Sequence, residues 1–160
     1  ISTPLFFLGS SPLDAKLQTI EIENSSTIIR SLESFRDLSN QNWQLIAYPS
    51  SIKRGSIILR IVGYPATLRI DHPTSLEVNS GRQGWILKDI TLLNPKLVQD
   101  YRDAALEFEL TPLLTDLNKN KPLSLSLPKT FYDFPIPPYL VKEWRSLLET
   151  DFSNEGKADE

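Results

Sequence analysis

Side chains that could carry out catalysis are scarce in this chain. It contains one histidine, His72, and no cysteine, which excludes thiolate nucleophiles and cysteine-ligated metal sites. His72 could form a Ser-His-Asp arrangement with Asp71, but Pro73 follows it in a predicted turn and no Gly-x-Ser-x-Gly motif occurs. We therefore interpret His72 as a loop residue that helps to fix the turn, and we predict that the protein is not an enzyme.

Residue patterns for binding metal ions or phosphate are equally weak. The side chains that could bind a metal ion lie on separate predicted strands without a recognisable ligand spacing: His72, Asp71, Glu77 and Asp89. Glu21 with Glu23, and Glu107 with Glu109, occupy alternate positions, which is typical of a solvated strand face. No glycine-rich phosphate-binding motif is present. We predict neither a cofactor nor a metal ion.

The composition is that of an ordinary soluble domain. The chain has 160 residues and a net charge of −3, and its 17 basic residues are not clustered, which argues against nucleic-acid binding. No apolar run approaches the roughly 20 residues that span a bilayer. The chain begins at Ile1 and has no methionine, which, among several explanations, favours removal of a presequence.

The elements that must position any site are mostly short strands. Alternating or β-branched segments predict strands over 17–23, 27–36, 43–47, 56–63, 66–71, 75–79 and 85–92. Residues 39–42 read as a hairpin turn, and the segment 56–63 is rich enough in Ile, Leu and Val to be a central strand. Short connections of this kind favour an antiparallel sheet.

The second half of the chain adds helices. Asn94-Pro95 and Thr111-Pro112 each predict a helix start, with a strand over 105–110 between the two helices. The segment 123–127 alternates Leu with Ser and predicts a half-buried strand, and the prolines at both ends favour an edge position. A last helix, opened by Pro137 and Pro138, repeats apolar residues at helical spacing: Leu140, Val141, Trp144, Leu147 and Leu148.

These elements predict a mainly β domain. We expect an antiparallel β-sandwich or a partly open barrel of about seven or eight strands, with two or three short helices including a C-terminal helix. We assign residues 1–16 to a lead-in segment, 17–149 to the single β-rich domain and 150–160 to a polar tail that is predicted to be disordered.

Large aromatic side chains offer the best candidates for a partner-binding surface. They gather in a proline-rich stretch between Pro128 and Trp144 and again near the N-terminus. The predicted partner-binding residues are Phe6, Phe7, Phe131, Tyr132, Phe134 and Tyr139. The alternative is that half of the aromatic residues in the 128–144 stretch fill the core of the domain itself.

An ordered set of short strings resembles a known family. The strings are Ser-Phe-Arg-Asp at 34–37 before Trp43, LRIVGYP at 59–65, IDHP at 70–73, LSLSLP at 123–128 and Glu143-Trp144. Together they resemble a domain family of unknown function from cyanobacteria with chloroplast relatives, over about Thr27 to Leu148. No active site is established for that family. The resemblance implies an exported protein of the chloroplast thylakoid lumen, or of the cyanobacterial lumen or periplasm.

Two functions follow as expectations from this resemblance and from the scarcity of catalytic groups. The first is a non-catalytic auxiliary, assembly or repair factor, peripheral to the membrane, that binds the lumenal side of a photosynthetic complex. Photosystem II is the first expected partner, with photosystem I and the NDH complex as alternatives. The second is a small-molecule (lipid or pigment-like) binding β-domain, with a pocket lined by Trp43, Trp85 and Trp144.

Overall fold

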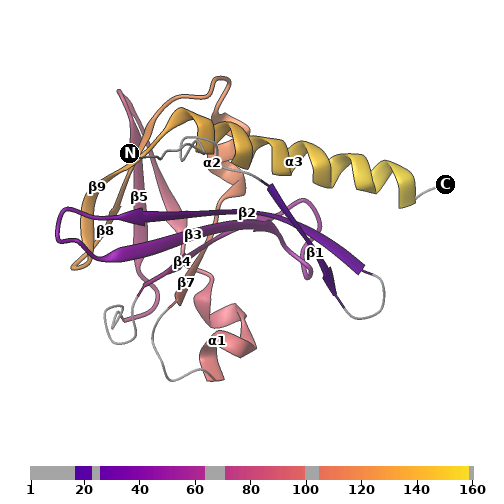
Figure 1. Ribbon diagram of the computed structural model, residues 1–160, viewed down its shortest axis with the longest axis horizontal. Coiled ribbons are helices and arrows are strands. Elements are labelled where there is room, and N and C mark those ends of the chain that lie inside the picture. The colour runs from indigo at the N-terminus through magenta and orange to yellow at the C-terminus, as the bar shows by residue number, and fades with distance from the viewer. Residues whose placement is uncertain (1–16, 23–25, 64–70, 100–104, 159–160) are drawn as a thin grey trace, which may run out of the picture.

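The strands form two antiparallel sheets (Figure 1). The computed structural model describes residues 17–22, 26–63, 71–99 and 105–158. The five-stranded sheet has the order β1 (Leu17–Ile22), β2 (Ser26–Arg36), β3 (Asn42–Pro49), β4 (Ile57–Val62), β7 (Ala105–Glu109). The four-stranded sheet has the order β6 (Gln83–Lys88), β5 (Ser75–Ser80), β8 (Leu123–Leu127), β9 (Phe131–Ile136). The prediction of a mainly β, antiparallel architecture is confirmed.

Side-chain alternation explains how the five-stranded sheet faces the core. Trp43, Leu45 and Ala47 of β3 are buried on one face, as their spacing predicted, together with Ile57, Leu59 and Ile61 of β4. β4 lies between β3 and β7, so the prediction of a central strand is confirmed. The intervening residues of β3, β4 and β7, which include Tyr48, Arg60 and Glu107, lie on the outer face of this sheet.

The two sheets enclose one hydrophobic core. At one side, the ring of Trp43 meets Phe131 edge-on with 5.4 Å between centroids, and Phe35 meets Phe134 in the same manner at 5.5 Å. At the other side, a β-bridge pairs Asp89, which follows β6, with Phe108 of β7. This bridge brings the end of β6 against the five-stranded sheet, where the candidate site lies.

The α-helices begin near the predicted positions: α1 (Pro95–Gln99), α2 (Thr111–Asp116) and α3 (Pro138–Ala158). The 3-10 helix η1 (Thr91–Leu93) was not predicted; the strand expected over 85–92 ends at Lys88 as β6, and η1 takes the place of its last residues. Figure 1 shows α3 along the upper side of the view and α1 on the lower side. α3 buries Leu140, Val141, Trp144 and Leu147, and it packs on β2, β3 and α2. Within the described ranges, no helix has the length and apolar character needed to cross a lipid bilayer.

β8 and the two ends of the chain differ from the expected arrangement or lie outside the described residues. β8 is not an edge strand, because it pairs with both β5 and β9; Pro122 and Pro128 lie just outside its ladder and remove no donor from it. Helix α3 continues to Ala158, through most of the tail predicted to be disordered, because adding a residue to an existing helix gains a hydrogen bond and no proline interrupts it. The lead-in 1–16 and most of the expected strand 66–71 lie outside the described residues.

Candidate functional site

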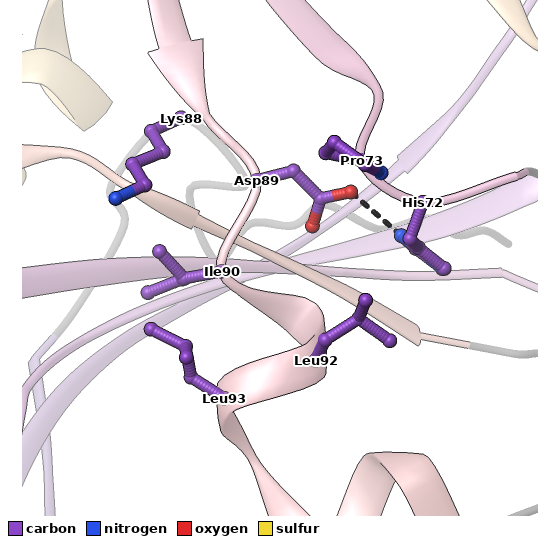
Figure 2. Close-up of a pocket in the computed structure, with 7 residues that line it drawn as sticks. All are labelled: His72, Pro73, Lys88, Asp89, Ile90, Leu92 and Leu93. Atoms are coloured by element: carbon purple, nitrogen blue, oxygen red, sulfur yellow. Dashed lines mark hydrogen bonds and ion pairs between the residues drawn. The ribbon is translucent and has the colours of Figure 1, made fainter.

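A small pocket lies where the loop before β5 meets the segment after β6. Its volume is about 120 Å³, and it is lined by His72, Pro73, Lys88, Asp89, Ile90, Leu92 and Leu93. Figure 2 shows His72 and Asp89 pointing toward one another from the two segments. The pocket is therefore built by the sole histidine, one carboxylate and an otherwise mainly apolar wall.

Asp89 joins these two segments through four hydrogen bonds. Its Oδ2 lies 2.6 Å from Nδ1 of His72 and accepts the Thr74 backbone N–H at 3.0 Å. Its Oδ1 accepts both the backbone N–H and the hydroxyl of Thr91, at 2.9 Å and 2.5 Å. Because the Asp89 side chain is only 1% exposed, these bonds replace almost all of its contact with water.

The charge state of Asp89 follows from these contacts. Burial by itself raises the pKa of a carboxyl group, but the hydrogen bonds from His72, Thr91 and the Thr74 backbone outweigh it and lower the pKa of Asp89. An ionised carboxylate that holds a histidine Nδ1 is also the geometry that orients a catalytic base. Among the described residues, however, the side chains that line this pocket include no hydroxyl or thiol nucleophile. We interpret the His72–Asp89 contact as an interaction that fixes the two segments.

Thr91 connects this contact to the backbone of Glu107, whose carboxyl group is also buried. Its Oγ1 accepts the Glu107 backbone N–H at 3.0 Å, and the Ile90 N–H donates to the Glu107 carbonyl at 2.9 Å. Glu107 itself is 2% exposed on the outer face of β7. The segment that follows β6 is thereby held to β7 by backbone and side-chain bonds together.

Glu107 is fully surrounded by donors. Arg60 Nε donates to its Oε2 at 2.9 Å, the Tyr48 hydroxyl donates to the same oxygen, and Asn94 Nδ2 donates to Oε1 at 3.0 Å. Burial and the adjacent Glu107 carboxylate raise the pKa of Tyr48 far above its ordinary value, so that its hydroxyl stays a donor. Since Asn94 separates η1 from α1, Glu107 fixes both helical segments on the sheet.

The helical segments fixed in this way carry exposed apolar side chains. Leu92 is 59% exposed, Leu93 69% and Val98 53%, and α1 packs against η1. We call Leu92, Leu93 and Val98 the η1–α1 surface. Of the other large exposed apolar residues in the described chain, Leu38 and Ile52 lie in connections between strands, and Ile86 and Tyr132 lie on the edge strands β6 and β9. Single exposed apolar residues of this kind are normal on protein surfaces.

One comparison with known proteins identifies a family. The model of a family described as "Protein of unknown function (DUF3122)" matches residues 15–147. The chain belongs to the DUF3122 family. Searches of curated proteins and of solved structures each found no match. The DUF3122 match includes the pocket, the Glu107 contacts and the η1–α1 surface, and the family description assigns none of them a role.

The predicted aromatic surface is only partly exposed in this DUF3122 domain. Phe131 and Phe134 are 6% and 5% exposed and belong to the core, so the core-filling alternative applies to them; Tyr139 is half-buried and packs against the same core. Residues three apart on a regular strand point to opposite faces, but Phe131 and Phe134 both point inward because the β8–β9 register shifts between Leu125 and Leu127. Tyr132 is 69% exposed. Phe6 and Phe7 lie outside the described residues.

The three tryptophans of this DUF3122 domain do not line the pocket beside His72 and Asp89. Trp43 and Trp144 are buried in the core, and Trp85 is half-buried with its Nε1 donating to Asp116. A volume of about 120 Å³ is also smaller than the ~300–1,000 Å³ of typical small-molecule sites. The pocket is of a size for a single side chain.

The structure also separates most of the residues considered as metal ligands, and it buries one of the paired carboxyl groups that were expected on a solvated face. Of the four possible metal ligands, His72 and Asp89 come together, whereas Asp71 and Glu77 are exposed; the described residues contain no group of three or more acidic or histidine side chains suited to a metal ion. The alternation of Glu107 with Glu109 suggested a solvated face, but Glu107 is buried because Arg60, Tyr48 and Asn94 surround its carboxyl group and η1 packs against β7. Sequence reasoning missed the Glu107 contacts. The signal that could have pointed to them is the Asn94-Pro95 helix start, because its polar capping residue, Asn94, donates to Glu107 on β7.

Proposed function

We propose that this DUF3122 domain is a non-enzymatic interaction domain that binds a protein partner through the η1–α1 surface. The observation that carries the proposal is that exposed Leu92 and Leu93 line a pocket of side-chain size, and that exposed Val98 lies on α1, which packs against η1. Interfaces gain most of their energy from a few apolar anchors that fill such pockets. A partner side chain inserted beside Leu92 and Leu93 would be enclosed by apolar atoms on several sides.

We further propose that the partner is a membrane protein complex of the photosynthetic apparatus, with photosystem II first and photosystem I or the NDH complex as alternatives. The support is the resemblance of the ordered strings, including Ser-Phe-Arg-Asp at 34–37 and IDHP at 70–73, to a cyanobacterial and chloroplast family. On this proposal the protein acts in the thylakoid lumen as an auxiliary, assembly or repair factor that is peripheral to the membrane.

The test is co-purification from gently solubilised thylakoid membranes with two matched variants. Leu93→Asp places a charge on the η1–α1 surface, whereas Leu38→Asp places the same charge on an exposed, isolated leucine in the β2–β3 turn. Wild type and Leu38→Asp should co-purify with a photosynthetic complex, and Leu93→Asp should lose at least tenfold of that recovery, which corresponds to about 1.4 kcal/mol.

Two outcomes would count against the proposal. Recovery of wild-type protein only in the free lumenal fraction, under every light regime, would remove the photosynthetic partner. Equal recovery of the two variants would retain a partner and refute the η1–α1 surface as its binding site. Circular dichroism of each purified variant establishes that both are folded.

A further inference from the structure

Helix α3 carries a carboxyl group into its interface with the sheet. Glu143 is 7% exposed, although it lies in the first half of a helix whose apolar residues Val141 and Trp144 are fully buried. α3 packs on β2, where Ser31 and Glu33 share the inner face because they are two residues apart. The Glu143 side chain is therefore enclosed between α3 and β2.

Polar atoms in this interface lack hydrogen-bond partners. Within the described part of the chain, Glu143 Oε1, Ser31 Oγ and Trp144 Nε1 are each buried without a hydrogen bond of good geometry, although the Ser31 hydroxyl lies close to the Glu143 carboxyl group. This contrasts with Glu107 and Asp89, whose oxygens are surrounded by donors. Burying a neutral polar group without a hydrogen bond destabilises the folded state, and burying an unpaired charge does so much more strongly. The interface is therefore better suited to a neutral carboxylic acid than to a carboxylate.

The charged groups around Glu143 provide no compensating cation. Among the described residues, β2 contributes Glu33 on the same face, the buried face of β3 contributes only apolar side chains, and Asp116 of α2 accepts from Trp85. On α3, Arg145 donates to Asn120, and Lys142 is exposed. Arg30 precedes Ser31 and so lies on the opposite face of β2. The one ionisable neighbour from the sheet thus has the same charge as Glu143.

The direction of the Glu143 titration agrees with this geometry. Burial raises the pKa of Glu143, the neighbouring Ser31 hydroxyl lowers it less, and the negative charge of Glu33 raises it further. The ordinary value applies to the unfolded chain, so the folded protein holds a proton over a pH range in which the unfolded chain has released it.

We propose that the docking of α3 on β2 is coupled to the binding of one proton by Glu143. Because the folded state holds the proton more tightly, the stabilisation is fully present below the pKa of the unfolded chain and is lost as the pH rises through the pKa of the folded state. Acidification tightens α3 on the sheet, and a rise in pH loosens it. This coupling is a property of the domain itself and does not depend on the identity of its partner.

The test compares wild type with Glu143→Gln, since glutamine has the shape of the neutral acid and cannot ionise. Hydrogen exchange of the α3 amides, corrected for intrinsic exchange rates, is measured from pH 4 to 8. The ratio of wild-type to Glu143→Gln protection should fall as the pH rises from below to above the Glu143 midpoint. The total fall should be about tenfold for each pH unit by which that midpoint exceeds the ordinary glutamate value. Glu149→Gln, at an exposed position of the same helix, should keep the wild-type pH dependence.

Direct titration of the folded wild-type protein keeps the proposal falsifiable if Glu143→Gln does not fold. The side-chain carboxyl carbon of Glu143, followed by ¹³C NMR, should titrate above the ordinary glutamate value. A midpoint at or below that value overturns the proposal, and so does a Glu143→Gln variant whose α3 protection varies with pH as steeply as that of wild type. Both measurements use the isolated domain, so their failure is independent of the co-purification result.

Discussion

Replacing Asp89 by asparagine is the sharpest perturbation of the candidate site. The carboxylate accepts four hydrogen bonds from the two segments that form the pocket, and its side chain is almost fully buried. Asparagine has the same shape but offers only one accepting oxygen. If that oxygen keeps the two bonds from Thr91, the amide NH2 group faces His72 and the Thr74 N–H.

The expected cost can be worked out from these contacts. The Thr74 N–H meets another donor and loses its acceptor, which costs about 1–2 kcal/mol in this partly buried position. The two bonds from Thr91 now go to a neutral acceptor, and each loses about 0.5–1 kcal/mol relative to a charged one. The free energy of unfolding should fall by about 3 kcal/mol, which for a domain of this size lowers Tm by roughly 6–12 °C.

Urea unfolding at several pH values is the assay, with Asp71→Asn as the control because Asp71 is exposed in the same loop. The pKa of Asp89 is lowered in the folded protein, so its contribution is present above the unfolded pKa and is lost as the pH falls through the folded pKa. The difference between wild type and Asp89→Asn should therefore shrink in acid. A difference below about 0.5 kcal/mol at pH 7, within the range of ordinary surface substitutions, would refute this reasoning.

Two further substitutions test the buried carboxyl group and the aromatic strand. Glu107→Ala removes the carboxylate that accepts from Arg60, Tyr48 and Asn94, and it should lower the free energy of unfolding by about 2–4 kcal/mol in urea titrations. A loss under about 1 kcal/mol would mean that solvent and the Arg60–Tyr48 hydrogen bond replace those contacts. Phe134→Ala should lower the free energy of unfolding by about 3–5 kcal/mol because it deletes a core side chain, whereas Tyr132→Ala should lower it by less than about 0.5 kcal/mol. Equal falls in the thermal unfolding midpoints of the two variants would contradict the assignment of Phe134 to the core.

The features that could be predicted from the sequence are those encoded by short-range periodicity. Trp43, Leu45 and Ala47 recur at every second position, and five of the eight residues in segment 56–63 are Ile, Leu or Val, so strand identity and the buried face followed directly. The proline-marked helix starts followed from local chemistry in the same way. Each of these signals lies within about ten residues of chain.

The features that could not be predicted depend on which distant segments meet. His72 and Asp89 are 17 residues apart, and Arg60 and Glu107 are 47 apart, so no local pattern pairs them. The inward orientation of Phe131 and Phe134 depends on a register shift between β8 and β9. A shift of one position moves side chains to the other face of a sheet, which is why the exposed aromatic surface was overestimated.

The cost of the two buried carboxyl groups supports a role for the segment that they hold. η1 and α1 are too short to be stable by themselves, and a buried ion pair is often no more stabilising than apolar residues of the same volume. Hydrogen bonds to Asp89 and Glu107 do, however, fix the direction of these segments, which apolar packing does less strictly. Leu92 and Leu93 are thereby held in one orientation beside the pocket, so a binding partner would lose less conformational entropy in ordering them. We infer that the buried carboxyl groups of Asp89 and Glu107 serve to hold the η1–α1 surface in one rigid orientation, and not to stabilise the fold alone.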